Sequence, residues 1–253
     1  MEIKIGDILL LGGDSDYKLS PPVSGLESPA YRVGDGLYAG RDGGFISGHF
    51  YGHRTLVLKG FYIGEDCENA AELGQMLVYY LQIRKDLPIL VTWNNGDQYY
   101  TEGRITDIKS DIENLVAGEF QITLLCPDPI LYKAEDGEVV WNEKTLGSST
   151  VVGNDGDLEA YPIITITGAT NGIKLVNTTS ELLMQIDVET EEDDVVVIDM
   201  GKRIITLNDK AINETRTLSS SWWGLLLEDN EIELALDGAA TATIKWREGY
   251  SGI

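Results

Sequence analysis

The clearest hydrophobic pattern in the sequence is helical and lies between Asp66 and Asp86. Apolar and tyrosine side chains recur there at helical spacing and fall on one face: Leu73, Leu77, Tyr80 and Leu81, with Met76 and Ile83 widening the stripe. This stretch predicts the one helix of the chain. Gly74 interrupts the stretch and weakens an isolated helix by about 1 kcal/mol relative to alanine, a cost that packing of the apolar face would offset.

Polar residues mark the ends of this predicted helix. Asp66 can accept hydrogen bonds from the first turn, and Arg84 and Lys85 favour the negative end of the helix dipole. Pro88 is expected to stop the element.

Around the helix, apolar residues follow the alternating pattern of β-strands. The first half predicts strands over 55–62, 89–93 and 99–108 and a last strand pair over 115–126, after an opening strand that contains Ile3, Ile5, Ile8, Leu9 and Leu10. Asn95-Gly96 is a strong hairpin-turn signal. The first half is therefore expected to be a small β-sheet with one helix laid on it.

The second half reads as short strands separated by turn residues. Strands are predicted over 139–141, 162–166, 173–176, 182–188, 195–199, 203–206, 223–227, 232–236 and 241–246, with a polar loop that extends to Asp157. Strands at this spacing with no helix between them favour an antiparallel sandwich.

The stretch from Gly12 to Asp42 is rich in glycine, serine, proline and aspartate. A compact domain rarely carries so long an idle segment, so we expect a functional or partner-ordered loop, with a short edge strand over 30–33. The glycines between Gly34 and Gly48 are interpreted as turn residues, because no phosphate-loop motif accompanies them.

Charge supports a division into two domains. The net charge is −23, and residues 1–133 contain 19 acidic and 11 basic residues, against 23 acidic and 8 basic in residues 134–253. We therefore predict domains over 1–133 and 134–253. So acidic a chain argues against a nucleic-acid clamp. No signal peptide, membrane span or cysteine framework is recognisable, and Cys67 and Cys126 fit buried thiols of a protein made in a reducing cytoplasm.

The ordered set of motifs resembles the distal tail proteins (Dit) of long-tailed bacteriophages. In the first half, the order of strand, Gly-rich loop, Arg54–Gly60, capped helix, strand and hairpin is similar to the N-terminal domain of that family. In the second half, the resemblance is carried by Gly153-Asn154-Asp155-Gly156, 161–168, 196–199 with 203–206, the turn at 229–232, and the closing strand 241–250. Glu228-Asp229 stands where the family has Pro-Gly in that turn.

The resemblance implies a mainly β fold: an N-terminal split-barrel sheet with one helix and a β-hairpin, then an antiparallel galectin-like β-sandwich. It implies a non-enzymatic structural hub at the virion tail tip, made in the host cytoplasm. The N-terminal domains would form a hexameric ring that contacts the tail tube protein, a tail-associated fibre or lysin protein and, in some phages, receptor-binding proteins. DNA would pass through the ring without being bound specifically, and neither a cofactor nor a membrane is implied.

Aromatic residues outside the clear core elements are the candidate contacts between copies, because aromatics are enriched at interfaces. They are Tyr31, Tyr38, Phe45, Phe50 and Tyr51 in the Gly-rich region, with Tyr99 and Tyr100 on the predicted hairpin. The other interpretation packs them against their own sheet, and the sequence leaves both open.

Trp222 and Trp223 suggest an alternative function, a carbohydrate-binding sandwich without catalysis. Neighbouring strand residues point to opposite faces, so one ring would be buried and the other available to a sugar; packing of both rings is the competing interpretation.

Catalytic and metal-binding readings find little support. His49 and His53 are the only histidines and lack a recognisable partner set, so they are interpreted as loop residues at a subunit contact. Residues 189–194 carry five carboxylates but not the spacing of a calcium loop, which favours a solvated hairpin tip. We predict no catalytic or metal-binding residue.

Overall fold

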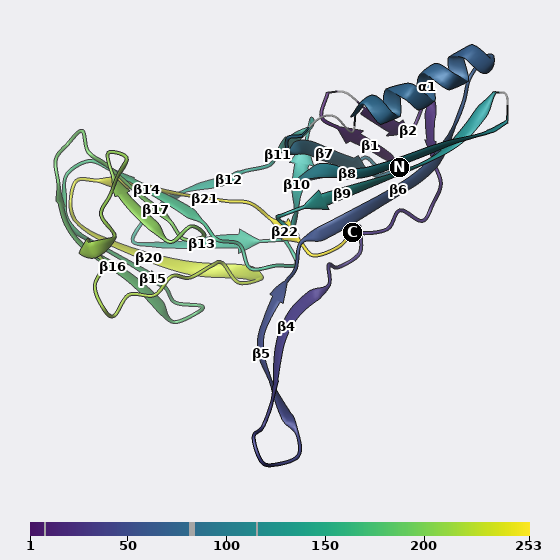
Figure 1. Ribbon diagram of the computed structural model, residues 1–253. Helices are drawn as coiled ribbons and strands as arrows, with labels where there is room; N and C mark the ends of the chain where they lie inside the picture. The colour runs from purple at the N-terminus through teal and green to yellow at the C-terminus, as the bar shows by residue number, and fades with distance from the viewer. Residues whose placement is uncertain (8, 81–83, 115) are drawn as a thin grey trace. The chain divides into compact units, whose positions relative to one another are not determined.

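The computed structural model describes residues 1–7, 9–80, 84–114 and 116–253. The chain forms two compact units (Figure 1). The first contains Met1–Val139 together with Ser251–Ile253, and the second contains Val140–Tyr250. Both are built mainly from antiparallel strands, which confirms the predicted fold class.

The first unit is a curved, nearly closed sheet in which the strands follow the order β2-β1-β7-β8-β9-β6-β3. The bounds are β1 (Glu2–Ile5), β2 (Leu9–Gly12), β3 (Tyr17–Leu19), β6 (Arg54–Ile63), β7 (Leu87–Thr92), β8 (Gln98–Asn114) and β9 (Ala117–Cys126). Two short strands, β10 (Leu131–Glu135) and β11 (Glu138–Val139), extend it, and β10 pairs with β8. The predicted turn at Asn95-Gly96 joins β7 to β8, with Gly96 at a φ of 94°.

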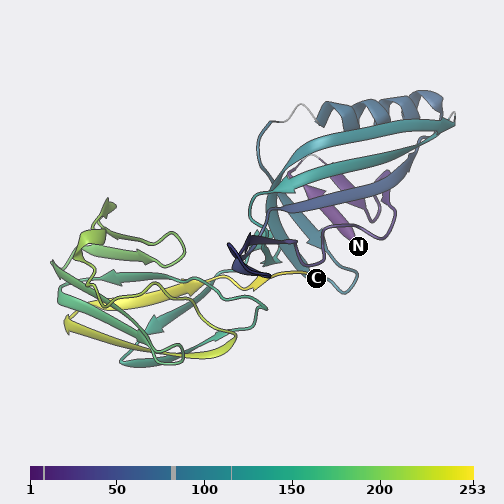
Figure 2. The same ribbon diagram turned by 60° about the horizontal axis from the view of Figure 1, so that its bottom comes forward.

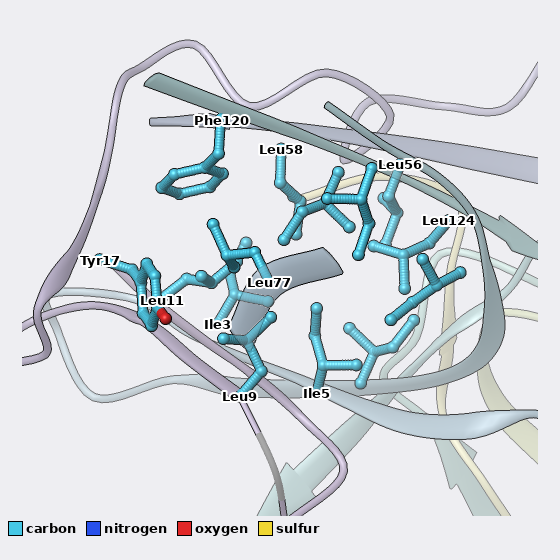
Figure 3. Packing of buried hydrophobic residues seen from close by; sticks show 14 of the residues in the cluster. Ile3, Ile5, Leu9, Leu11, Tyr17, Leu56, Leu58, Leu77, Phe120 and Leu124 are labelled. Atoms are coloured by element: carbon cyan, nitrogen blue, oxygen red, sulfur yellow. The ribbon is translucent and has the colours of Figure 1, made fainter. Parts of the chain in front are cut away.

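The core of this unit follows directly from the alternating pattern. Along β6 every second residue is buried, and Leu56, Leu58 and Tyr62 point inward. Figure 3 shows how side chains from β1, β2, β6 and β9 converge on Leu77 of the helix. The inward-pointing residues of the strands, which alternate along the sequence, and the apolar face of the helix thus form the core together.

The helix α1 (Cys67–Tyr80) lies over the sheet and contacts β8 (Figure 2). Asp66 caps it as predicted, because its Oδ1 accepts a hydrogen bond from the backbone N–H of Asn69 at 2.9 Å. Arg84 and Lys85 lie outside the helix, contrary to prediction, and Leu81 and Ile83 fall outside the described residues. Pro88 lies inside β7, so the helix ends well before it.

The structure corrects the prediction of a long loop over 12–42. That stretch contains β3 and β4 (Tyr31–Leu37), and β4 pairs with β5 (Gly44–Tyr51) as a separate two-stranded sheet (Figure 1). We call residues 31–51 the hairpin. Its glycines lower strand propensity, and all the residues that pair with β4 lie beyond residue 42, which explains why the sequence pattern did not reveal the hairpin.

The second unit packs two sheets around one core. One sheet has the order β12-β21-β14-β17-β18-β19 and the other β13-β20-β15-β16. The bounds are β12 (Asn142–Leu146), β13 (Ser149–Asn154), β14 (Ile163–Thr167), β15 (Thr170–Asn177), β16 (Leu182–Thr190), β17 (Val195–Asp199), β18 (Ile204–Leu207), β19 (Lys210–Ala211), β20 (Glu228–Gly238), β21 (Thr241–Trp246) and β22 (Gly249–Tyr250), with a 3₁₀ turn η1 (Asn213–Thr215).

Two predictions for this unit are wrong. The polar stretch before Asp157 forms β12 and β13, which are edge strands of the two sheets, so polar residues are tolerated there. The segment 223–227 is not a strand and makes only an isolated bridge between Ala160 and Leu225.

Candidate assembly interface

Five of the seven aromatic residues proposed as subunit contacts lie together on the hairpin. The Tyr31 and Tyr51 rings stack across the two strands with centroids 4.8 Å apart, and their hydroxyls are 3.2 Å apart. Nearer the tip, the centroids of Tyr38 and Phe45 are 5.8 Å apart. Aromatic cross-strand pairs of this kind stabilise a hairpin that has few other apolar contacts.

The hairpin exposes an unusual amount of apolar surface. Leu37 is 87% exposed, Ile46 76% and Phe50 65%. A two-stranded hairpin is marginal by itself in water, and exposed apolar patches typically mark interaction sites. The hairpin therefore has the character of a surface that a partner covers.

Glycines allow the close packing at the hairpin tip. The Phe45 ring lies over Gly36, where a Cβ atom would be only 2.7 Å from Cζ of the ring. Gly43 has a φ of 98°, a conformation that favours glycine, and it accepts a hydrogen bond from the backbone N–H of Tyr38. Arg41 then stacks on the Tyr38 ring, with Cζ 3.9 Å from the centroid.

A buried arginine fastens the base of the hairpin. Arg54 is 1% exposed and begins β6 shortly after the hairpin, and its guanidinium donates to carbonyl oxygens from separate segments. Nε donates to Pro129 O at 2.8 Å, Nη1 to Gly25 O and to Glu27 O at 2.8 Å, and Nη2 to Ser251 O at 2.6 Å. Since Gly25 and Glu27 precede β4, one side chain joins the entry and the exit of the hairpin.

The last residues of the sequence complete this clamp. The N–H of Ile253 donates to Leu26 O at 3.0 Å, and the Ile253 side chain packs against the core of the first unit. The carboxylate of Glu27 accepts a hydrogen bond from the backbone N–H of Gly25. A hydrogen bond from its own backbone N–H, the bond from Gly25 and the nearby charge of Arg54 lower the pKa of Glu27. We call Arg54, residues 25–27 and residues 251–253 the clamp. The sequence shows no signal for it.

Tyr99 and Tyr100 do not join the hairpin aromatics. They lie in β8, where Tyr99 pairs with Val91 and Tyr100 with Leu90 of β7. Burial raises the pKa of Tyr99, and the Tyr100 hydroxyl donates to Glu102 at 2.6 Å. Both are half-buried parts of the sheet.

The two tryptophans of the second unit have different environments. Trp223 is 1% exposed, so its ring offers no face to a sugar and serves the core. Trp222 is half-buried, and the Arg216 guanidinium lies 5.6 Å from the centre of its ring.

Buried asparagines, which the sequence analysis missed, hold the segment around Trp223. Asn154 donates to Leu225 O at 3.1 Å, and Asn177 donates to Gly224 O at 3.3 Å. Asn230 accepts from the N–H of Leu226 and donates to its carbonyl, both at 2.8 Å. Amide side chains thus make the hydrogen bonds to the backbone that a neighbouring strand would otherwise supply.

The carboxylates and the histidine considered as metal or catalytic candidates do not form a site in the described residues. Asp194 closes the turn between β16 and β17, because its oxygens accept from Glu191 N and Asn208 Nδ2, which lowers its pKa. In the part of the chain that the structure describes, no three His, Cys, Asp or Glu residues are placed to hold a metal ion. His53 is exposed after β5. No described helix has the length and apolarity needed to cross a membrane.

The chain thus combines a nearly closed sheet that carries an exposed apolar hairpin with a second unit built from two antiparallel sheets. Residues 155–250 match the family described as "Siphovirus-type tail component, C-terminal domain". The chain is also 25% identical over 214 residues to the distal tail protein of Bacillus phage SPP1, covering 82% of each protein. Over most of its length the chain is therefore homologous to the SPP1 distal tail protein, and residues 155–250 carry the tail-component domain.

The fold agrees with this assignment. The crystal structure of the SPP1 Dit protein, described as a paradigm of the hub adsorption apparatus in phages that infect Gram-positive bacteria, has a TM-score of 0.73. The identity in that superposition is 16%, and 98% of each chain is covered. A chain of the phage P2 baseplate gives a TM-score of only 0.42 at 11% identity, over 100% of this chain and 99% of the other. The chain therefore has the fold of the SPP1 Dit protein.

Proposed function

We propose that the first unit assembles into a hexameric ring that joins the tail tube to the tip and lets DNA pass. The single observation that carries this proposal is the hairpin, with Leu37 and Ile46 exposed at 87% and 76%. Side chains of this kind lose their contact with water when identical copies cover them, and cyclic symmetry is the common arrangement for such copies.

The proposed partners follow from the position of a hub. The tail tube protein would bind one face of the ring, a tail-associated fibre or lysin protein the other, and receptor-binding proteins the periphery. The net charge of −23 supports a passage that repels DNA and does not hold it.

The test is the mass of the purified protein across a concentration series, measured by sedimentation velocity. The full chain is expected to form a hexamer at high concentration, whereas Leu37→Ser with Ile46→Ser should shift it to monomers. Leu218→Ser is the matched control, because Leu218 is also fully exposed but belongs to the second unit. A wild-type chain that stays monomeric at the highest concentration would refute the ring.

The alternative of a carbohydrate-binding sandwich has no comparable support. Trp223 is buried in the core and only Trp222 keeps part of its ring exposed. One half-buried ring does not form a sugar platform, and a sandwich fold alone does not establish sugar binding.

A further inference from the structure

A groove runs between α1 and β8 on the first unit. Its volume is about 750 Å³, and its lining includes Tyr62, Gly74, Met76, Tyr79 and Ser110. Gly74 keeps it open, because a Cβ atom there would lie 2.7 Å from Oη of Tyr62. That hydroxyl lies 3.1 Å from Oγ of Ser110 at the base of the groove.

The helix is apolar on two sides. Ala70, Leu73 and Leu77 are buried in the core, as an amphipathic helix requires. On the outer side, Val78 is 50% exposed and Tyr79 63%, and both line the groove. A helix that serves only its own core would place polar residues there, so the groove has the character of an unfilled binding surface.

The charges of groove and hairpin are complementary. From Glu65 to Tyr80 the chain contains acidic residues but no lysine or arginine, and Glu72 lines the groove. The hairpin tip presents Arg41, which Tyr38 holds by stacking, next to the exposed side chains of Leu37 and Ile46. Within one chain both apolar surfaces are exposed, so neither covers the other.

We propose that the hairpin tip of one copy docks in the α1–β8 groove of the next copy, with Arg41 facing Glu72. Such a contact joins two different surfaces and is therefore heterologous, the type that closes into a ring when its rotation allows. The inference rests on the proposed ring and names the surface that receives the hairpin.

A cysteine cross-link between copies tests the contact. One sample carries Leu37→Cys and the other Val78→Cys, both with Cys67→Ser because Cys67 is an exposed thiol at the start of α1. Mild oxidation of the mixed rings is expected to give a disulfide-linked dimer of the two variants. Replacing the hairpin cysteine by Leu218→Cys in the second unit is the control and should give no specific dimer.

Charge reversal gives an independent readout. Arg41→Glu and Glu72→Arg should each weaken assembly roughly fivefold to tenfold, as expected for an exposed ion pair turned repulsive, and the double variant should recover most of the loss. If the variants form rings normally, give no cross-link and show no rescue in the double charge-reversal variant, this contact is wrong but the proposed ring is not. Absence of any ring would instead refute the proposed function and this inference together.

Discussion

Replacing Arg54 by methionine should loosen the base of the hairpin and destabilise the first unit. The variant keeps an unbranched apolar chain about as long as the aliphatic part of arginine but removes every donor of the guanidinium. The carbonyls of Gly25, Glu27, Pro129 and Ser251 then lose hydrogen bonds that a charged group donates. The clamp would lose its centre while the sheet stays intact.

The magnitude follows from these four bonds. A hydrogen bond from a charged donor contributes about 1.5–3 kcal/mol, and these contributions are not additive. The four carbonyls belong to residues that are partly exposed, so water can replace some of the lost donors. We therefore expect the free energy of unfolding of the first unit to fall by about 3–5 kcal/mol. Arg54→Lys should recover part of this loss, because one ammonium group cannot reach all four carbonyls.

Urea denaturation followed by hydrogen exchange with mass spectrometry measures both parts of this prediction. Exchange should accelerate at the N–H groups of Gly52 and Ile253, which bond to Ala30 and Leu26, and stay unchanged in the second unit. A loss below about 1 kcal/mol, less than a single charged bond should contribute, with unchanged exchange at both sites, would refute the clamp.

Three further substitutions and reagents test other parts of the structure. A glycine-to-alanine change inside a helix usually raises the free energy of unfolding by about 1 kcal/mol, but Gly74→Ala should not, because its Cβ would clash with Oη of Tyr62. In a Tyr62→Phe background, denaturation experiments should show that increase again. Burial raises the pKa of the Cys126 thiol to about 11, so at pH 8 a thiol reagent should label Cys67 alone until the protein unfolds, and rapid labelling of both would contradict this. Trp223→Ala should lower the unfolding free energy of the second unit by about 3–5 kcal/mol, and a loss under 1 kcal/mol would contradict its core role.

Periodicity was a sufficient guide wherever one face of an element is buried. The strands over 195–199 and 241–246 have the bounds that alternation predicts, and the stripe through Leu73 and Leu77 is the buried face of α1. Asn95-Gly96 identified its turn because few residue pairs adopt that backbone conformation.

The candidate site was only partly predictable because its geometry depends on contacts distant in sequence. Composition singled out the hairpin aromatics, but their pairing needs a register that glycine-rich strands specify weakly. Arg54 donates a hydrogen bond to Ser251, which is distant in sequence, and the residues around Arg54 give no pattern that predicts this contact. The groove stays open because Gly74 of α1 has no Cβ to contact Tyr62 of β6, a contact between two elements that the sequence pattern does not predict.

The most direct test of the ring is electron microscopy of the purified full chain at high concentration. We expect closed particles with sixfold symmetry whose inner wall is formed by the first unit, with the hairpin of each copy covered by a neighbour. Single particles with the hairpin in solvent, or open filaments with no closed ring, would contradict it.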